Sequence, residues 1–347
     1  MVEIALRAQP ETGRAATRVP TGVVVIVLAL LTVLLCLVSL AVGSQSLTLE
    51  ELVSAFAPGE RTVASIIVWQ LRMPRTVLAA MVGAALAVAG VVMQGLTRNP
   101  LAEPGILGVN AGASLSVVLS MSLLGLTDVG EFLWFAFAGA ALAAFLVHLI
   151  SVRSADAGPA RLVLAGVALG ASLRSITGTV TMYDSVTFDS YRFWVLGSLV
   201  DRDAELLVWV APFLVVGLVL ALASGLTLNA LALGEEQAQA LGVSPRRARA
   251  LALTSITLLC GASTAAVGPI SFVGLVVPHV LRLALGADQR KLLVVSVVAG
   301  PVLLLAADIL GRVILDSGEM EAGVVTAFIG GPVLLLMVIQ RMGVRGR

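Results

Sequence analysis

Residues 72–113 read RMPRTVLAAMVGAALAVAGVVMQGLTRNPLAEPGILGVNAGA, in which an apolar stretch runs through the turn NPLAEPG at 99–105 into a second apolar stretch. The two prolines of this turn each fix φ and remove a backbone donor, so neither flanking helix continues through it. We therefore expect a shaped break between two membrane helices. Asn99, Pro100, Glu103 and Pro104 form this break. We interpret it as a hinge or as a support for an inner gate, rather than as a substrate contact.

The composition places the chain in a membrane. Hydrophobic residues make up 59% of the 347 residues and charged residues 12%, whereas soluble domains have roughly 45–50% and 25%. Mean hydropathy is +1.03. These values predict an all-α polytopic membrane protein. The net charge of +1 argues against nucleic acid as a partner, because no basic stripe is available to displace counterions from phosphates.

The cysteines and histidines do not indicate a metal site. Cys36 and Cys260 lie inside apolar runs without ligand spacing, so we interpret them as small side chains buried in the membrane. His148 and His279 lie near expected helix ends without a second ligand at helical spacing. We expect neither a metal nor a directly bound cofactor.

Ten apolar segments are long enough to be candidate membrane helices. We expect them at 22–42, 74–97, 105–125, 131–151, 161–182, 204–228, 247–267, 270–286, 291–313 and 322–341. The first is about twenty residues long, which suits a full span better than the 7–15 apolar residues of a signal peptide. The expected organisation is therefore a polar tail at 1–21 and a single transmembrane domain at 22–347.

The basic residues predict the orientation. If the N-terminus is cytoplasmic, the inside segments hold Arg7, Arg14, Arg18, Arg98, Arg153, Arg161, Arg246, Arg247, Arg249, Arg282, Arg290, Lys291, Arg341, Arg345 and Arg347. These are most of the 22 basic residues of the chain. The positive-inside rule thus favours both termini in the cytoplasm and an even number of spans.

Small residues recur with the same spacing in the two halves. Gly83-Ala84, Gly90 and Pro100 in the first half match Gly261-Ala262, Gly268 and Pro278 in the second. With the expected topology this spacing predicts an inverted repeat, an architecture that many transporters share. A chance match in a chain rich in Gly and Ala is the alternative. Small residues also let membrane helices approach closely, so we expect tight packing around Gly83 and Gly90.

The chain does not carry its own ATP site. A P-loop requires GxxxxGK[ST], and the one lysine of the sequence, Lys291, lies in DQRKL. Transport powered by ATP would therefore need a separate subunit and a cytoplasmic surface for it.

The segment LGEEQAQALGV at 233–243 is the best candidate for that surface. We expect one or two helical turns with Ala238 and Leu241 on a common face. Gly242 would end them and Ser244-Pro245 would start the next helix. Without a family resemblance, such a segment is more often a solvated connection than a docking element. The candidate coupling residues are Leu233, Gly234, Glu235, Glu236, Ala238, Leu241 and Gly242.

Several motifs together resemble one family. They are RxPR, GAALAxAGxxxQ and RNPLAEPGxLGVxAGA in the opening stretch, LGxxxAxxLGV at the coupling segment, FWVLGSL at 193–199, GPISFVGLVVPH at 268–279, ADILGR at 307–312 and GVVTAFIGGP at 323–332. These motifs are similar to those of FecCD-type permeases, the membrane subunits of type II ATP-binding cassette importers for iron-siderophores, haem or vitamin B12. One departure is GEMEAG at 318–323, where the family more often has a Glu-Leu-Pro turn.

The resemblance implies a BtuC-like fold and a set of partners. It implies two ATPase subunits that carry ATP and Mg and dock at coupling helices, here about 233–246. It also implies a substrate-binding lipoprotein or periplasmic protein and a second permease subunit, which is a paralogue in a heterodimer or a second copy of this chain. The implied location is the bacterial cytoplasmic membrane, with contact to membrane lipid.

The resemblance also implies that arginines on the outer face receive carboxylates of the binding protein. The matching positions are Arg72, Arg75 and Arg312. The alternative is that these side chains snorkel to the interface, or that Arg312 pairs with Asp308 one helical turn earlier.

Arg174 lies near the middle of the fifth expected span, where ionisable side chains are costly. In the resembled permeases this helix lines the translocation path, which gives Arg174, Ser175 and Thr177 as candidates. A cation there would favour an anionic cargo such as a ferric chelate; a structural arginine is the alternative. We expect an importer of an iron-siderophore chelate, with a haem or cobalamin importer of the same family as the alternative. A secondary transporter would need intramembrane carboxylates, and a membrane enzyme would need a nucleophile with its base.

Overall fold

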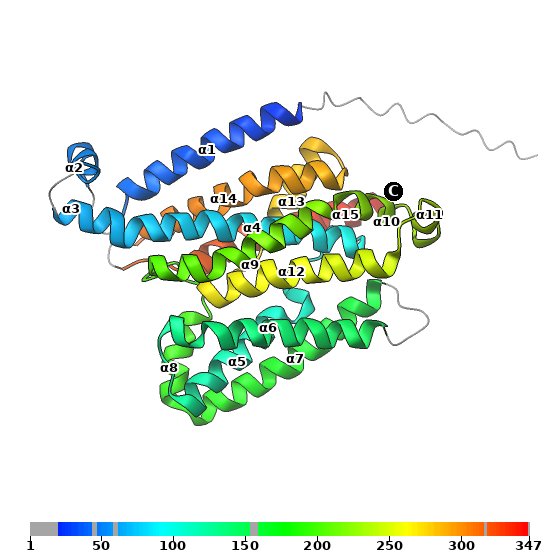
Figure 1. Ribbon diagram of the computed structural model, residues 1–347, viewed down its shortest axis with the longest axis horizontal. Coiled ribbons are helices and arrows are strands. Elements are labelled where there is room, and N and C mark those ends of the chain that lie inside the picture. The colour runs from blue at the N-terminus through cyan, green and yellow to red at the C-terminus, as the bar shows by residue number, and fades with distance from the viewer. Residues whose placement is uncertain (1–19, 44–46, 58–61, 153–158, 316–317, 346–347) are drawn as a thin grey trace, which may run out of the picture.

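The computed structural model describes residues 20–43, 47–57, 62–152, 159–315 and 318–345 as an elongated bundle of helices (Figure 1). Within these residues all regular elements are helices. Eight are long and apolar enough to cross a membrane. Their bounds are α1 Thr21–Ala41, α4 Met73–Thr97, α6 Val129–Val152, α7 Pro159–Tyr183, α9 Ala204–Ala223, α12 Pro245–Val267, α14 Gln289–Val313 and α15 Ala322–Arg345.

Two shorter apolar helices and several short elements complete the bundle. The short apolar helices are α5 (Val109–Leu124) and α13 (Val273–Leu285). The remaining elements are α2 Leu49–Ser54, α3 Val63–Ile66, a π-helical segment Ile67–Arg72, a 3-10 helix Pro104–Leu107, α8 Ser185–Trp194, α10 Gly225–Ala232 and α11 Glu235–Ala240. We name the two ends of the bundle after α2 and α11, which lie at opposite ends in Figure 1.

The ten expected spans all correspond to helices, with three shifted boundaries. Helix α5 begins at Val109, because Pro104 opens a 3-10 turn that ends at Gly108 with φ +77°. Helix α13 begins only after Phe272, whose φ is +70°. The span expected at 204–228 is divided at Ser224 into α9 and α10. The expected tail at 1–21 lies almost entirely outside the described residues.

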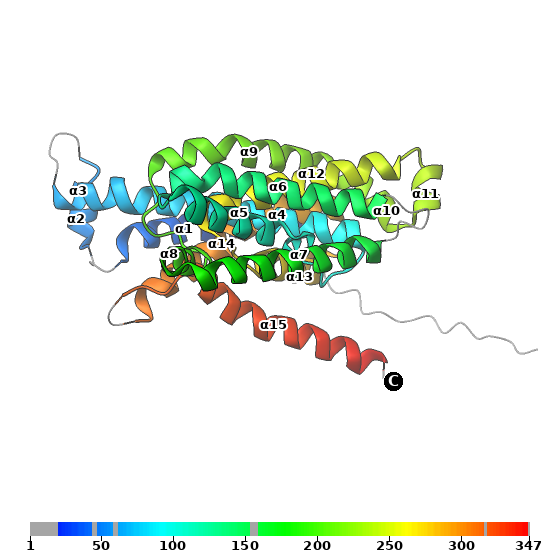
Figure 2. The same cartoon turned by 90° about the horizontal axis from the view of Figure 1, so that it is seen from below.

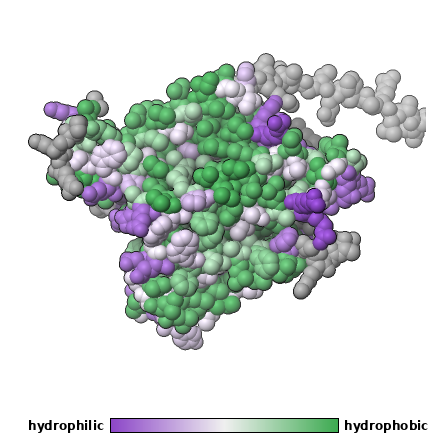
Figure 3. All heavy atoms as spheres, viewed as in Figure 1, coloured by the Kyte–Doolittle hydropathy of each residue, from purple (hydrophilic) through white to green (hydrophobic). Residues whose placement is uncertain are grey.

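Helix α4 occupies the centre of the bundle. It contacts α14, α12, α13 and α9, while α5, α6 and α7 pack on one another on one side and contact α12 through α6 and α5 (Figures 1 and 2). Figure 2 shows α15 along one edge. The surface in Figure 3 is largely hydrophobic along the bundle, with hydrophilic residues gathered toward its two ends. This distribution is that expected of helices surrounded by lipid.

Glycines allow α4 to approach its neighbours at van der Waals distance. A Cβ added to Gly83 would lie 2.7 Å from the carbonyl oxygen of Gly300 in α14, and one added to Gly90 would collide with the backbone of Gly274 in α13. The tight packing expected around Gly83 and Gly90 is therefore confirmed.

The two halves share one arrangement, in which a long helix precedes a short one. Helix α4 is followed by α5 and contacts α13, while α12 is followed by α13 and contacts α5. The residue spacing that suggested the repeat does not mark equivalent positions, however. Gly90 lies inside α4 whereas Gly268 follows the end of α12, and Pro100 lies in a turn whereas Pro278 lies inside α13.

Candidate functional site

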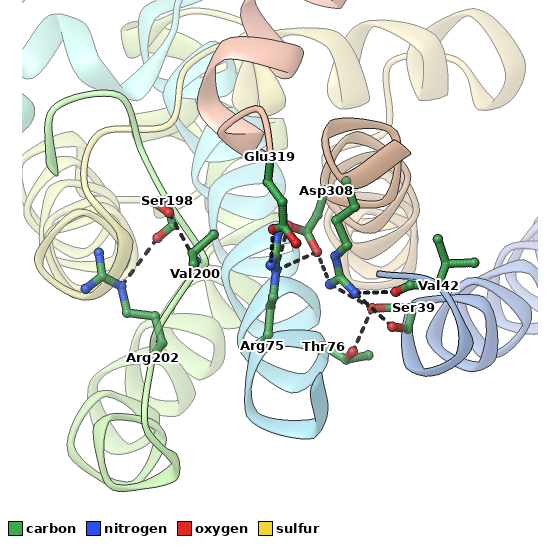
Figure 4. A network of polar contacts seen from close by, with 10 residues as sticks. Ser39, Val42, Arg75, Thr76, Ser198, Val200, Arg202, Asp308 and Glu319 are labelled. Atoms are coloured by element: carbon green, nitrogen blue, oxygen red, sulfur yellow. Dashed lines mark hydrogen bonds and ion pairs between the residues drawn. The ribbon is translucent and has the colours of Figure 1, made fainter. Parts of the chain in front are cut away.

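A buried network of charged side chains joins four parts of the chain at the α2 end (Figure 4). Arg75 of α4 donates to Asp308 of α14 at 2.7 Å and to Glu319 at 2.6 Å, the latter from the segment before α15. Arg312, one turn after Asp308, donates to the other oxygen of the same carboxylate. Because a buried charge is tolerated only when it is paired, Asp308 acts as the shared counter-ion of two arginines.

Helix α1 is attached to this network through its last turn. Arg312 donates to the backbone oxygens of Ser39 at 2.8 Å and Val42 at 3.1 Å. The hydroxyl of Ser39 lies 2.7 Å from that of Thr76 in α4. Arg72 donates to the carbonyl oxygens of the neighbouring residues Leu40 and Ala41. The arginines thus satisfy carbonyl groups that the end of a helix leaves unpaired.

The three arginines expected on an outer surface are therefore largely buried. Arg72, Arg75 and Arg312 are only 6%, 9% and 5% exposed. The pairing of Arg312 with Asp308, considered as an alternative from the sequence, is present. The link from Arg75 to Asp308 was not predicted, since the two residues are 233 positions apart.

A cavity of about 700 Å³ lies beside the network and gives access to it. Arg72, Arg75, Arg312 and Glu319 contribute to its lining, together with Arg202 from the segment between α8 and α9. Figure 4 shows Arg202 across from Arg75. Burial lowers the pKa of Arg202, although Glu321 and Asp201 act in the opposite direction. The cavity therefore presents several guanidinium groups to whatever enters it.

The opposite end carries α11, a short helix held against the start of α12. Ala238 is fully buried with Ala230, Leu231 and Ala248, and Glu235 forms an ion pair with Arg249. The expected helix stop and restart are confirmed, because Gly242 has φ +78° and α12 begins at Pro245. Gly234, with φ +124°, likewise precedes the first residue of α11.

One detail of this segment was predicted wrongly. Leu241 does not share a face with Ala238: it is 64% exposed, because α11 has already ended at Ala240. Leu233, at the other end of the segment, is also 64% exposed, and Glu236 is exposed between them. The surface presented at this end therefore combines two exposed leucines with a carboxylate.

Helix α7 exposes polar side chains along its length. Ser172, Ser175 and Thr179 are exposed and lie at helical spacing on one face, and the hydroxyls of Ser172 and Thr179 donate to carbonyl oxygens of their own helix. Arg174 is also exposed, with its guanidinium beside Gly170 and no ion pair to any described residue. Thr177 is only 4% exposed and points into the bundle. Its position therefore does not support a role in lining a path.

The turn between α4 and α5 is a shaped break, as expected. Arg98 ends α4 with φ +51°, Asn99 accepts a hydrogen bond from the backbone of Leu101, and Pro100 follows Asn99 in the turn. Glu103 reaches into the bundle and accepts a hydrogen bond from the backbone N–H of Phe272 at 2.6 Å. Pro104 opens the 3-10 helix. A role as hinge or gate support stays a prediction.

The comparisons with known proteins decide the family. The model of the FecCD transport family matches residues 30–340. This chain belongs to the FecCD transport family. The ferric enterobactin transport system permease protein FepD of Escherichia coli is 44% identical over 90% of this chain and 94% of the relative. The hemin transport system permease protein HmuU of Yersinia pestis is 36% identical over 95% and 98%.

A solved structure has the same fold. It is described as an inward-facing conformation of a metal-chelate type ABC transporter, and it matches with a TM-score of 0.81 at 28% identity over 92% of this chain and 99% of that one. As a member of the FecCD family, this chain is a transmembrane permease subunit of an ATP-binding cassette importer, not an enzyme. Its ATPase is a separate subunit, and the importer includes a substrate-binding partner.

Proposed function

We propose that this permease imports a ferric siderophore chelate along a path formed by α7 and a second permease subunit. A binding protein delivers the chelate at the α2 end, and two ATPase subunits act at the α11 end. ATP and Mg are bound by those ATPases. The observation that carries this proposal is the polar exposed face of α7.

The α7 face supports a path because hydroxyl groups and a cation are unfavourable against lipid. In membranes such residues face a bundle interior or a water-filled cavity. Ser172, Ser175 and Thr179 share one exposed face of α7, and Arg174 is exposed about 100° around the helix from Ser175. A second permease, a paralogue or a second copy of this chain, would cover this face and leave an aqueous path between the two.

The distribution of charge supports an orientation with the α11 end in the cytoplasm. The basic residues at or near that end of the described bundle are Arg98, Arg161, Arg246, Arg247, Arg249, Arg282, Arg290 and Lys291. Exposed acidic residues gather at the α2 end, on the segments around α2, α6, α8 and α9. By the positive-inside rule, both termini would lie in the cytoplasm of a bacterial cell and the chain would lie in its cytoplasmic membrane.

The exposed surface around α11 suits the ATPases. Leu233 and Leu241 offer apolar side chains, while Ala238 and the Glu235–Arg249 ion pair hold the segment on the bundle. A short helix anchored in this way can transmit a movement of the ATPase to α12. At the α2 end, the cavity beside Arg72, Arg75 and Arg312 would receive carboxylates of the binding protein.

The cargo is proposed from Arg174 and from the similarity to FepD. A cation without an ionic partner among the described residues favours an anionic chelate over a neutral cargo. Haem and cobalamin are the alternative cargoes within the family. A secondary transporter is not supported, because Asp308 is held by two arginines and is not free to exchange a coupling ion.

An uptake experiment tests the proposed cargo. A bacterial strain that lacks this permease would be complemented with the wild-type gene and supplied in turn with iron-55 siderophores, haem and labelled cobalamin. We expect complementation to restore uptake of a siderophore. Restoration of haem or cobalamin uptake alone would assign the chain to that branch of the family.

A further inference from the structure

We propose that Glu319 occupies, within the chain itself, the position that a carboxylate of the docked binding protein takes at Arg75, so that docking proceeds by exchange of carboxylates. The proposal rests on the binding-protein docking suggested above. It concerns the same cavity and adds a competing residue of this chain.

The two acidic partners of Arg75 differ in their accessibility. The side chain of Asp308 is 1% exposed and is held by Arg312 as well as by Arg75. The side chain of Glu319 is 21% exposed and lines the cavity. Glu319 contacts Arg75 through one guanidinium nitrogen at 2.6 Å. Of the two carboxylates, Glu319 is the one that an incoming group can reach and replace.

The charge balance makes exchange more favourable than simple release. Arg72, Arg75 and Arg312 face two carboxylates, those of Asp308 and Glu319, so the group carries one net positive charge. Loss of Glu319 alone would leave two buried positive charges in excess, which is costly in a low-dielectric site. Glu319 should therefore leave only when another carboxylate enters.

The cavity has room for that carboxylate. Its volume of about 700 Å³ is lined by four arginines and three carboxylates, so guanidinium groups are in excess by one; the lining charges are Arg72, Arg75, Arg202, Arg312, Asp201, Asp203 and Glu319. Arginine binds carboxylates through paired hydrogen bonds of fixed geometry. A glutamate or aspartate side chain on the partner would suit this opening.

The exchange of carboxylates would also affect a membrane helix, α15. Glu319 lies three residues before α15, and its neighbour Met320 donates a backbone hydrogen bond to Gly311 of α14 at 2.8 Å. Gly323, in the first turn of α15, donates to the carbonyl oxygen of Gly197 at 3.0 Å. Displacement of Glu319 would therefore act on the start of α15, which connects docking to a membrane helix.

Binding measurements on the assembled importer test the exchange. The permease with its ATPase would be placed in lipid nanodiscs, and the cargo-free substrate-binding protein titrated against wild type, Glu319→Gln and the control Glu205→Gln. Glu205 is exposed at the same end and has no ion pair to a described residue. We expect Glu319→Gln to bind several-fold more tightly than wild type, because the competitor has lost its charge, and Glu205→Gln to bind as wild type.

The outcomes separate this inference from the docking proposal. Equal or weaker binding by Glu319→Gln, when wild type binds, would contradict the exchange and leave docking intact. Failure of wild type to bind would contradict docking itself. If Glu319→Gln does not assemble, a second measurement is made on an assembly whose one substitution is Met320→Cys. A fluorophore is attached to this cysteine. Its signal should change on addition of the binding protein, and an unchanged signal at saturation would contradict the exchange.

Discussion

The carboxylate of Glu103 accepts a hydrogen bond from the backbone N–H of Phe272, two residues that are 169 positions apart. Phe272 has φ +70°, an unusual conformation for a residue with a side chain, and such conformations persist only where the surroundings hold them. The bond joins the break after α4 to the start of α13. It therefore connects the first half of the chain to the second inside the bundle.

Removal of this acceptor should destabilise the start of α13. We expect Glu103→Ala to cost about 1–3 kcal/mol, the typical penalty for a buried donor left unpaired, and to lower uptake. Glu103→Gln keeps a carbonyl acceptor and should retain most of the stability. Thermal unfolding in detergent and uptake in cells would measure both. Equal losses in the two variants would show that the negative charge matters, and not the hydrogen bond.

The contact between Gly90 and Gly274 should tolerate no side chain. A methyl group at Gly90 would collide with the backbone of α13, so Gly90→Ala should destabilise the permease by about 1–3 kcal/mol through overpacking. Gly178→Ala is the matched control, since nothing lies within 4 Å of the added methyl group, and it should be neutral or slightly stabilising. A thermal shift that is the same for both variants would contradict this account of the packing.

The network at the α2 end should depend most on Asp308. We expect Asp308→Asn to cost about 3–5 kcal/mol, because it leaves Arg75 and Arg312 buried without their shared counter-ion. Asp203→Asn, at an exposed position of the same end, should change stability little. Chemical denaturation of the two variants would measure this difference. Full stability of Asp308→Asn would mean that Glu319 alone neutralises the arginines.

The leucines around α11 should determine ATPase binding. Leu241→Asp should weaken association with the ATPase at least about tenfold, since a hot-spot apolar side chain at an interface contributes on the order of 2 kcal/mol. Leu123→Asp, at a 75% exposed position near the α2 end, should leave association unchanged. Co-purification and ATPase stimulation would report the effect. Loss of the ATPase in both variants would indicate a general folding defect.

The sequence was sufficient to predict the ten helices from their apolar stretches, although only eight of them in the described residues are long enough to cross a membrane. The short helix α2 was not predicted, although Thr48 and Glu51 form a capping box whose Thr-x-x-Glu spacing is visible in the sequence. The short helix within 233–243 and its end were predicted from the turn residues, and its role in coupling stays a prediction. The position of Leu241 was mispredicted, because a pattern does not say on which residue a two-turn helix stops.

Among the site residues, too, some contacts follow from the sequence and others depend on the fold. The pairing of Asp308 with Arg312 follows from helical spacing, whereas the contact of Arg75 with Asp308 depends on how α4 packs on α14. The helical period of 100° per residue places Thr177 about 200° from Ser175, so the two could not share a face. That signal was present in the sequence. The contact of Glu319 with Arg75 depends on a loop conformation that no periodicity encodes.

The most direct test of the proposed mechanism is the effect of Arg174→Met on the choice of cargo. The measurement is the initial rate of ATP-driven uptake into proteoliposomes that contain the full importer, with an anionic ferric siderophore and with a neutral chelate of similar size. We predict that the variant loses much more of its rate for the anionic chelate than for the neutral one. An equal loss for both, or no loss for the anionic chelate, would contradict a path along α7 in which Arg174 meets the cargo.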